Sequence, residues 1–368
     1  MKIALVVPGG VDRSGTERVI PCLLWLVERL TAASHEVHLF ALNQEPSPGE
    51  WPLLGASVHN AGLRWPRTRT VSAMLREHRK QPFKVVHAFW AGAPGQAAAL
   101  FSAIARVPFA VTLPGGDLAA LPDIGYGARL RWRGRLSTSA VLSRAAAIIV
   151  PSDWMAAEAA ALGWRTTTIP FGVAVDRWPA MRPRPRSPGT PIRLIHAASL
   201  NRVKDPFGLL RAMRLLADLG VEFTLDIIGE DTLAGAVQRQ CTDLGLDARV
   251  RFHGFVPNAE LRGWFERSDL LVMNSRHETG PIVLLEAAMT GVPTVGTAVG
   301  TIADWAPDAA IAVPTSDSGA LASAIAGLAE HEEERLRLAA AAQARARGHD
   351  ADAYARALVS LYAELATS

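Results

Sequence analysis

The stretch HETGPIVLLEA, residues 277–287, places two glutamates eight residues apart around a predicted helix start. Pro281 favours the first helical position, because its fixed φ suits a helix and its missing N–H is not needed there. Glu278 then precedes the helix in a loop, and Glu286 lies in the second turn. One carboxylate can therefore meet the reacting end of a ligand. The other, about a turn and a half further along, can accept hydrogen bonds from a diol such as that of a ribose.

The start of this helix is also suited to bind an anion. With Pro281 as its first residue, the cap is expected at Gly280 or Thr279. The free backbone N–H groups of Ile282 and Val283 would point in front of the helix and attract a pyrophosphate. The stretch therefore predicts a site for a nucleotide sugar. The simpler alternative is an amphipathic helix with two solvated glutamates.

The sequence that follows, AMTGVPTV at residues 288–295, reads as the entry into another strand. Together with residues 277–287 it resembles the E-x7-E region of the retaining glycosyltransferases of family 4, also described as glycosyl transferases group 1. The resemblance covers essentially the whole chain and is denser in the second half. It implies the GT-B architecture, in which two Rossmann-like doubly wound α/β domains face a cleft. It also implies retaining transfer of a hexose or similar sugar from a nucleoside diphosphate sugar to an acceptor hydroxyl or amine.

Length and composition are compatible with this class. A chain of 368 residues that is 49% hydrophobic is too long for one ordinary core, so two domains are expected. The net charge of +3 does not require a nucleic-acid partner. Cys22 and Cys241 lie far apart without metal-ligand or C-x-x-C spacing, and free buried thiols in a reducing compartment are expected. The first apolar run is too short for a signal peptide or a membrane span.

Short β-branched runs alternate with longer Ala/Leu-rich stretches, which is typical of parallel strands joined by helices. In the first half, strands are expected at residues 2–7, 36–42, 85–87, 109–113, 147–150 and 167–169. In the second half, they are expected at residues 192–197, 224–228, 250–253, 270–274, 294–296 and 310–313. This rhythm predicts two doubly wound units in tandem.

The domain boundaries follow from composition and from the family pattern. Residues 1–173 are expected to form an N-terminal, acceptor-side Rossmann-like domain. The Pro- and Arg-rich residues 174–190 read as an extended linker, and residues 191–349 as the nucleotide-sugar donor-binding domain. In the family, a C-terminal helix such as residues 350–368 packs back on the first domain.

Two cations follow the strand expected at residues 192–197, at the end of the sheet where open α/β folds bind ligands. Lys204 matches the family lysine that holds the donor pyrophosphate. The family arginine position holds Ser199 instead, and Arg202 is the expected substitute. Taken alone, a lysine at such a position is more often a surface charge.

Two further strand ends resemble donor-site segments of the family. Gly229 ends the strand expected at residues 224–228 and would let the backbone approach the ligand. Phe255 and the backbone of Val256 could face a nucleobase, with core packing as the alternative for Phe255. Ser275 and His277 are additional candidates for the pocket.

In the first half, Gly15 belongs to a segment that resembles the family G-G-x-E-R motif and is expected to open a helix, presenting amides to a phosphate or sugar. Residues 112–117 resemble the family T-x-H-G-x-D motif, but Pro114 takes the histidine position. Asp117 fits the retained acid and is the expected contact to acceptor or donor, or else a helix cap. His87 is a weaker candidate for the cleft.

Two segments interleave arginine with tryptophan, residues 63–69 and 129–135. Such a pattern suits docking to an anionic membrane surface, and a solvated basic surface is the alternative. Aromatic and basic residues also serve single-stranded nucleic acids, but no recognition module accompanies them, so no nucleic-acid partner is expected. The protein is expected in the cytoplasm, with the inner face of the membrane as the meeting place for a lipid-linked acceptor.

The resemblance assigns the reaction to three catalytic candidates, Glu278, Asp117 and Lys204. The expected donor-binding residues are Gly15, Arg202, Lys204, Gly229, Phe255, Val256, Gly280, Pro281, Ile282 and Glu286. No cofactor or metal is expected, because Asp350 and Asp352 form a D-x-D only at a helix start, where acids act as caps. The acceptor could be a lipid, a polysaccharide or a small molecule.

Two other functions are open at this point. Pro114 and Ser199 depart from the family pattern, which is compatible with a catalytically silent nucleotide-sugar-binding scaffold. A GT-B epimerase acting on a UDP-sugar would need no acceptor pocket, and the Arg/Trp segments weakly disfavour it. The base, the sugar, the linkage and the oligomeric state do not follow from the sequence.

Overall fold

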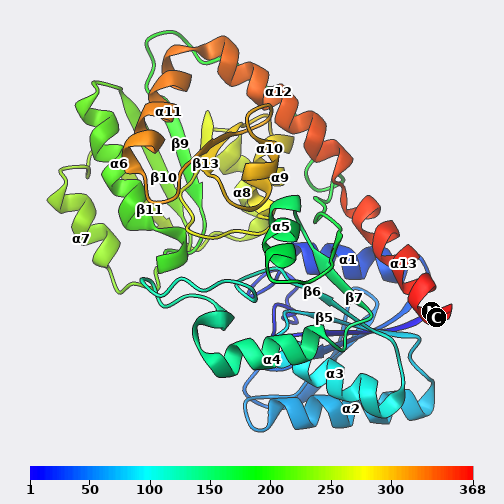
Figure 1. Cartoon of the computed structure of the whole chain (residues 1–368). Coiled ribbons are helices and arrows are strands. Elements are labelled where there is room, and N and C mark those ends of the chain that lie inside the picture. Colours follow the sequence, from blue (N-terminus) through cyan, green and yellow to red (C-terminus); the bar gives the residue numbers. More distant parts are fainter. Residues whose placement is uncertain (368) are drawn as a thin grey trace. The chain divides into compact units, whose positions relative to one another are not determined.

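The computed structural model describes residues 1–367, which divide into two compact units. Unit 1 contains Met1–Gly172 together with the C-terminal helix, and unit 2 is Val173–Asp350. Each unit has helices packed on a largely parallel sheet (Figure 1). The expected fold class, α/β with two doubly wound units, is confirmed.

The sheet of unit 1 has eight strands in the order β3-β4-β2-β1-β5-β6-β7-β8. All neighbours pair in parallel except β3 and β4, which form an antiparallel hairpin at the edge. The strands are β1 Lys2–Val7, β2 Glu36–Ala41, β3 Gly49–Leu53, β4 Ala56–Asn60, β5 Val85–Phe89, β6 Phe109–Thr112, β7 Ala147–Val150 and β8 Thr167–Thr168.

The main helices of unit 1 are α1 Pro21–Ala32, α2 Pro66–Lys80, α3 Ala93–Ala105, α4 Trp132–Leu142, α5 Asp153–Ala161 and α13 Ala351–Thr367. A proline at one of the first two positions of α1, α2 and α3 favours these helix starts. Helix α13 lies beside α1 although the two are at opposite ends of the chain (Figure 1). Its buried face includes Tyr354, Leu358 and Tyr362, so apolar burial holds it against this unit.

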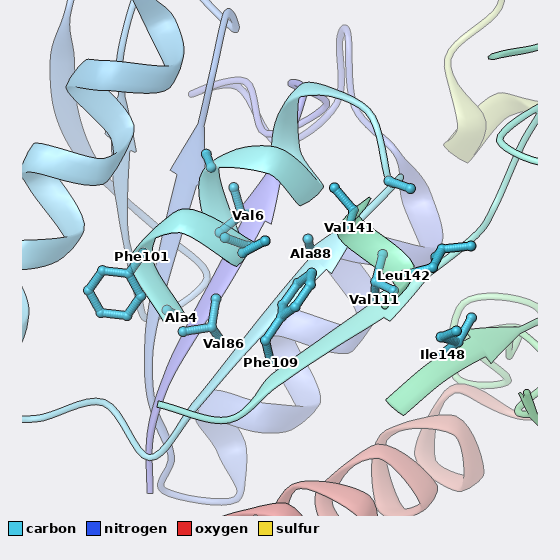
Figure 2. Packing of buried hydrophobic residues seen from close by; sticks show 14 of the residues in the cluster. Ala4, Val6, Val86, Ala88, Phe101, Phe109, Val111, Val141, Leu142 and Ile148 are labelled. Atoms are coloured by element: carbon cyan, nitrogen blue, oxygen red, sulfur yellow. The ribbon is translucent and has the colours of Figure 1, made fainter. Parts of the chain in front are cut away.

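Helices α3 and α4 cover one face of the unit 1 sheet. Figure 2 shows Phe101 of α3 and Val141 and Leu142 of α4 among the buried side chains of this layer. Val86 and Phe109 come from the adjacent strands β5 and β6. Each fully buried side chain of this size stabilises the fold by roughly 1.5–3 kcal/mol, so this layer fixes the position of the loops at the strand ends.

The sheet of unit 2 has six parallel strands in the order β11-β10-β9-β12-β13-β14. The strands are β9 Ile192–Ala197, β10 Phe223–Ile228, β11 Val250–Gly254, β12 Leu270–Met273, β13 Thr294–Thr297 and β14 Ile311–Val313. The helices are α6 Pro206–Asp218, α7 Ala236–Asp243, α8 Asn258–Phe265, α9 Ile282–Met289, α10 Gly300–Trp305, α11 Ser318–Glu330 and α12 Glu332–Gly348.

In both units the strand order reverses at one point, between β1 and β5 in unit 1 and between β9 and β12 in unit 2. At such a switch point the loops after the two central strands diverge to opposite faces. The crevice that they leave at the carboxyl edge is where open α/β sheets bind ligands. The two switch points are therefore the places to look for a site.

Several local expectations need correction. The hairpin of β3 and β4 was not expected, since Trp51-Pro52 and polar neighbours interrupt the pattern of a strand.

The Pro- and Arg-rich segment at residues 174–190, expected as a linker, lies within unit 2 and is bound to it. The N–H of Met181 donates to the carbonyl of Met289 at 2.8 Å, and the carbonyl of Arg184 accepts from Nη2 of Arg335 at 2.6 Å.

None of the helices in residues 1–367 combines the length and apolar composition that a membrane span needs. In the same residues, no group of three or more His, Cys, Asp or Glu side chains is arranged to hold a metal ion. Asp352, part of the D-x-D sequence, instead pairs with Arg29 at 3.5 Å. Cys22 and Cys241 are both buried and form no disulfide, and burial raises the pKa of Cys241 to about 11.

Candidate active site

A short 3-10 turn, Arg202–Lys204, follows β9 at the switch point of unit 2. The side-chain oxygen of Asn201 accepts hydrogen bonds from the N–H groups of Val203 and Lys204, each at 3.1 Å. The N–H of Arg276, in the loop after β12, donates to the carbonyl of Val203 at 2.7 Å. The loops that follow the two central strands are thus joined, which holds Lys204 at the crevice.

Lys204 and Glu278 form an ion pair in this crevice. The Ser275 hydroxyl donates to the same carboxylate oxygen at 2.9 Å. Both charged side chains are partly accessible, with 21% and 11% of their surfaces exposed, so an incoming ligand can reach them. The structure therefore brings together two of the three catalytic candidates from segments 74 residues apart in sequence.

The backbone of Glu278 and Thr279 packs closely against Gly300, the first residue of α10. Gly300 has a φ of +55°, and a Cβ atom at this position would lie 2.5 Å from the carbonyl oxygen of Thr279 and 2.9 Å from that of Glu278. Only glycine fits this contact without displacing the loop. The Thr297 hydroxyl adds a bond of 2.5 Å to the carbonyl of Ser275. The loop is therefore fixed before any ligand arrives.

Helix α9 begins one residue later than expected. Pro281 is its cap, with an extended ψ of 116°, and Ile282 is the first helical residue. The expectation that Pro281 opens the helix is wrong by one position. The reason is that Leu284 donates to the carbonyl of Pro281 at 3.1 Å, which closes the first turn with Pro281 outside it. Gly280 precedes the cap, and the first N–H groups of the helix still lie beside Glu278 in the chain.

Glu286, in the second turn of α9, is only 2% exposed. Burial raises its pKa to about 7, and a 2.7 Å hydrogen bond from the amide of Asn258 acts in the opposite direction. A solvated pair of glutamates is therefore excluded as an account of this helix. The two carboxylates differ, because Glu278 is paired with a cation and Glu286 with a neutral amide.

A pocket of about 330 Å³ lies at the ends of β9, β10 and β11. Ser199, Gly229, Phe255 and Val256 contribute to its lining, together with Val283 of α9. Phe255 is 59% exposed, so the core-packing alternative for it is wrong. This pocket has the mainly apolar lining that suits a planar base, which remains a prediction.

Gly229, in the lining of this pocket, occupies a position that only glycine fits. Its φ is +145°, and a Cβ atom there would overlap the carbonyl of Ala198. The backbones after β9 and β10 therefore approach each other closely. Arg202, the expected substitute for the missing family arginine, is exposed. Within residues 1–367 its guanidinium makes no hydrogen bond or ion pair, so it is not joined to the Lys204–Glu278 pair.

Asp117 lies in the loop that follows β6 in unit 1, and its side chain reaches the loop that follows β5. Its Oδ1 accepts a hydrogen bond of 2.8 Å from the N–H of Ala91, and the N–H of Gly92 also contributes. Because Gly92 caps α3, Asp117 supports the start of that helix. Its Oδ2 is buried with no partner among the described residues, and burial raises the pKa of the carboxyl to about 6. Support of a helix start and contact with a ligand are thus compatible.

Gly15 lies in a loop rather than at a helix start, because α1 begins only at Pro21. The expectation that this segment opens a helix at Gly15 is wrong. The loop is closed by a bridge between Val11 and Val19, and Asp12 accepts from the N–H of Ser14 at 3.0 Å. Gly15 adopts a φ of +67°, which glycine allows at little cost, and its contact with a ligand remains a prediction.

His87 is a core residue. Its Nδ1 lies 2.6 Å from the hydroxyl of Tyr362, its Nε2 lies 2.7 Å from that of Thr112, and the side chain is fully buried. Burial lowers its pKa to about 3, so the ring stays neutral at physiological pH. His87 therefore links α13 to the sheet, and the expectation that it lines the site is wrong.

Other residues of the site were not found from the sequence. Asn258 reaches Glu286 from a segment 28 residues away. His196, at the end of β9, is buried and donates from Nδ1 to the carbonyl of Val272 at 2.9 Å. Only Asn201 had a local signal, because an asparagine just after a strand often forms a turn with the N–H groups that follow.

The Arg/Trp segments lie on neighbouring helices of unit 1. We call the surface of α2, α3 and α4 the basic face (Figure 1). Its exposed apolar side chains are Leu63, Trp65, Leu100, Ile104, Trp132 and Leu136. Residues 61–76, 91–107 and 128–146 contain no Asp or Glu. The face thus combines apolar side chains with charge of a single sign.

Comparison with known proteins shows which families the two halves of the chain match. Residues 179–345 match the family described as Glycosyl transferases group 1, and residues 19–172 match the one described as Glycosyl transferase 4-like domain. A D-inositol 3-phosphate glycosyltransferase of Arthrobacter sp. (strain FB24) is 35% identical over 130 residues, which is 33% of this chain. The chain spans 31% of that relative's length.

Solved structures share the fold over the whole chain. Sucrose-phosphate synthase (tll1590) from Thermosynechococcus elongatus has a TM-score of 0.85 at 19% identity, with all of both chains covered. Anabaena Alr3699/HepE, solved in complex with UDP-glucose, has a TM-score of 0.75 at 19% identity and covers 99% of this chain and 100% of its own. At this identity the similarity establishes the fold alone.

Proposed function

Because the chain belongs to the glycosyl transferases group 1 family and has the GT-B fold, we propose that it transfers a sugar from a nucleoside diphosphate sugar to an acceptor hydroxyl, with retention at the anomeric carbon. The observation that carries this proposal is the Lys204–Glu278 ion pair, next in the chain to the start of α9. A hexose is the expected sugar. The acceptor belongs to the lipid, polysaccharide or small-molecule class.

The donor diphosphate competes for Lys204. In the free protein this ammonium is neutralised by Glu278. A bound diphosphate offers stronger acceptors, and the N–H groups at the start of α9 add to the attraction. Lys204 then stabilises the negative charge that develops on the leaving diphosphate. Glu278, released from the lysine, accepts hydrogen bonds from hydroxyls of the transferred sugar.

The nucleoside is held further along α9. Glu286 accepts hydrogen bonds from the ribose diol, with Asn258 keeping one of its oxygens in place. Phe255 and the backbone of Val256 line the pocket for the base. The complex of Anabaena Alr3699/HepE with UDP-glucose, on the same fold, supports a nucleotide sugar as the ligand and makes UDP-sugars the first donors to test.

Asp117 acts on the acceptor side of the reaction. Its free Oδ2 can accept a hydrogen bond from an acceptor hydroxyl and orient it. We propose that no metal ion is needed, because Lys204 and the α9 start supply positive charge where the diphosphate binds. Activity that persists in EDTA would support this, and loss of activity in EDTA that Mg²⁺ or Mn²⁺ restores would contradict it.

We also propose that the basic face contacts an anionic membrane surface, at the inner face of the cytoplasmic membrane. Trp65 and Trp132, 74% and 65% exposed, have indole rings of the kind that settle at the level of lipid headgroups. The arginines around them add electrostatic attraction that high salt should weaken. Contact of this kind would bring the protein to a lipid-linked acceptor.

The test of the proposed function is a screen of UDP-, GDP-, ADP- and dTDP-sugars for thermal stabilisation and for sugar release. Stabilisation by one donor, with slow release of free sugar that is lost in Glu278→Ala, supports a transferase and identifies its donor. Stabilisation that Glu286→Ala abolishes, without any turnover in the presence of candidate acceptors, favours a silent binder. A protein that responds to no nucleotide would contradict the donor site.

A further inference from the structure

A second cavity, of about 480 Å³, lies in unit 1 between the first half of α2 and the hairpin of β3 and β4. We call it the α2 pocket. Its polar lining includes Glu50, Asn60, Arg69, Thr70 and Arg76. None of these residues has a role in the donor site, which belongs to unit 2. Its volume falls in the range of small-ligand sites.

The wall of the pocket formed by Asn60 is rigid. This side chain is 4% exposed and uses both ends of its amide. Its Oδ1 accepts from the N–H of Gln44 at 3.0 Å, and its Nδ2 donates to the carbonyl of Ser47 at 2.7 Å. The loop before β3 is therefore bound to the end of β4, so the pocket needs no rearrangement to form.

The pocket carries an excess of positive charge. Glu50 is its acid, and that carboxylate is already bound to Arg76 at 2.7 Å and to Nδ1 of His59 at 3.1 Å. Arg69 has no carboxylate partner within residues 1–367, and its Nη1 donates only to the carbonyl of Ala61 at 3.3 Å. Most of its hydrogen-bond donors thus remain available to an anion.

Thr70 supplies an independent sign of a ligand. It lines the pocket and is 2% exposed, yet its hydroxyl has no hydrogen-bond partner among the described residues. A buried polar group without a partner is costly and uncommon in folded proteins. Arg69 lines the same pocket, and a carboxylate or a phosphate bound there could accept hydrogen bonds from both its guanidinium and the Thr70 hydroxyl.

The pocket opens where β4 ends, since Asn60 and Ala61 are part of its lining. Asp117 follows β6, and its carboxylate binds the N–H of Ala91 just after the end of β5, on the same carboxyl edge of the sheet. Strands β4 and β5 are three intervals apart in the sheet, which corresponds to about 14 Å. A ligand that extends along this edge can therefore reach both places.

We propose that the α2 pocket binds an anionic group, a carboxylate or a phosphate, that the acceptor carries at a distance from its reacting hydroxyl. The identification of this ligand as the acceptor rests on the proposed function. Binding energy from a remote part of a substrate helps to hold the reacting group in place. The pocket thus selects acidic acceptors over neutral ones.

The test measures binding without catalysis. Glucuronate, inorganic phosphate and neutral glucose are titrated by calorimetry into the full-length protein and into Arg69→Glu. The matched control is Arg79→Glu, which changes an exposed arginine of α2 outside the pocket. Lys204→Ala is included because inorganic phosphate can also enter the donor site. Hydrogen exchange of residues 61–76 locates the binding.

We expect glucuronate or phosphate, but not glucose, to bind and to protect residues 61–76. Glucuronate alone would identify a carboxylate site, and phosphate alone a phosphate site. The affinity should fall at least tenfold in Arg69→Glu and less than twofold in Arg79→Glu and Lys204→Ala. Absence of binding by either anion, equal losses in the two arginine variants, or protection confined to other segments would overturn the proposal.

Thr70→Val provides a second and sharper test. If the hydroxyl waits for a ligand, its removal should raise the melting temperature of the free protein and lower the affinity for the anion severalfold. A variant that is more stable but binds the anion unchanged would contradict the role of Thr70 and, with it, the site as described.

The two proposals fail in different ways. If anion binding depends on Arg69 but no donor supports sugar transfer, the pocket stands and the proposed function falls. If transfer occurs while Arg69→Glu changes neither anion binding nor the KM for acidic acceptors, the function stands and the pocket falls.

Discussion

The two units have the same strand order around their switch points but differ at the carboxyl edge of the sheet. In unit 2 the crevice holds a ready charge pair, Lys204 and Glu278, that a ligand can reach. In unit 1 the carboxyl edge holds Asp117, which follows β6. Its buried carboxyl accepts hydrogen bonds from backbone N–H groups and has no cationic partner within residues 1–367. The same type of sheet thus carries a fixed charge pair in unit 2 and an acid that can be neutralised in unit 1.

This difference fits two kinds of ligand. A diphosphate carries its own charge and needs a cation that is held in place beforehand. An acceptor hydroxyl is neutral and needs only an oriented acceptor atom, so a carboxyl whose charge varies with pH is sufficient. The predictions below test whether the two edges are really specialised in this way.

The largest effect is expected from Lys204→Ala. Loss of a preorganised charge at the leaving group should lower sugar transfer by about 100- to 1,000-fold. Arg211→Ala, an exposed cation on α6, is the control and should change the rate less than twofold. Initial rates with the donor found in the screen provide the measurement. A loss in Lys204→Ala no larger than that in the control would remove the specialisation of unit 2.

The next effect concerns Glu286. Its folded pKa, about 7, lies above the usual value of 4.5, so the folded state disfavours its charged form. The raised pKa therefore lowers the stability of the folded state. This loss of stability is absent below pH 4.5, grows as the pH rises to about 7, and is complete above that. The free energy of unfolding of Glu286→Gln should therefore exceed that of the wild type by up to about 3 kcal/mol at the upper end of this pH range. The variant should also bind the donor about tenfold more weakly.

Urea denaturation at several pH values measures this difference, and Glu333→Gln, at an exposed glutamate of α12, serves as the control. A Glu286→Gln variant whose advantage does not change with pH would show that the buried carboxylate is charged at all these pH values or neutral at all of them.

Asp117→Asn should also be more stable than the wild type at neutral pH, but by less than Glu286→Gln. The pKa of Asp117 is raised from 3.8 to about 6, so the loss of stability develops between these pH values. The new amide leaves N–H donors without partners at the position of Oδ2, which offsets part of the gain, and about 1–2 kcal/mol should remain. Acceptor KM should rise more than donor KM. An equal rise in both would place Asp117 outside the acceptor side.

The smallest effect is expected at the basic face. Trp132→Ala should leave stability within about 0.5 kcal/mol of the wild type, because the side chain is exposed. Its affinity for vesicles with anionic lipids should fall about fivefold, in a salt-dependent way. Sedimentation with vesicles measures this, and vesicles of neutral lipid provide the control. Equal binding of both proteins would leave the face without a membrane role.

Most strands were predictable because each is a short apolar run with a turn on either side. The hairpin of β3 and β4 was not, since Pro52 and Glu50 break the alternation and the pairing is antiparallel at a sheet edge. The start of α9 was placed within one residue, because a proline near a helix start acts locally.

The candidate site was predictable only where its signals are local. The sequence placed Lys204 and Glu278 each after a strand, but not in contact with each other, because their pairing depends on how β9 and β12 meet at the switch point. It also could not indicate that Glu286 is buried or that Asn258 binds it. His87 was misjudged because its burial depends on Tyr362, 275 residues away.

The most direct test of the account is the binding of a nucleoside diphosphate, without its sugar, to the wild type, Lys204→Ala and Glu278→Gln. The base is the one that the donor screen identifies. If Glu278 occupies Lys204 until a diphosphate replaces it, Glu278→Gln should bind the diphosphate as tightly as the wild type or more tightly, while losing sugar transfer. Lys204→Ala should bind it at least tenfold more weakly. Weaker diphosphate binding in Glu278→Gln, or unchanged binding in Lys204→Ala, would contradict the account.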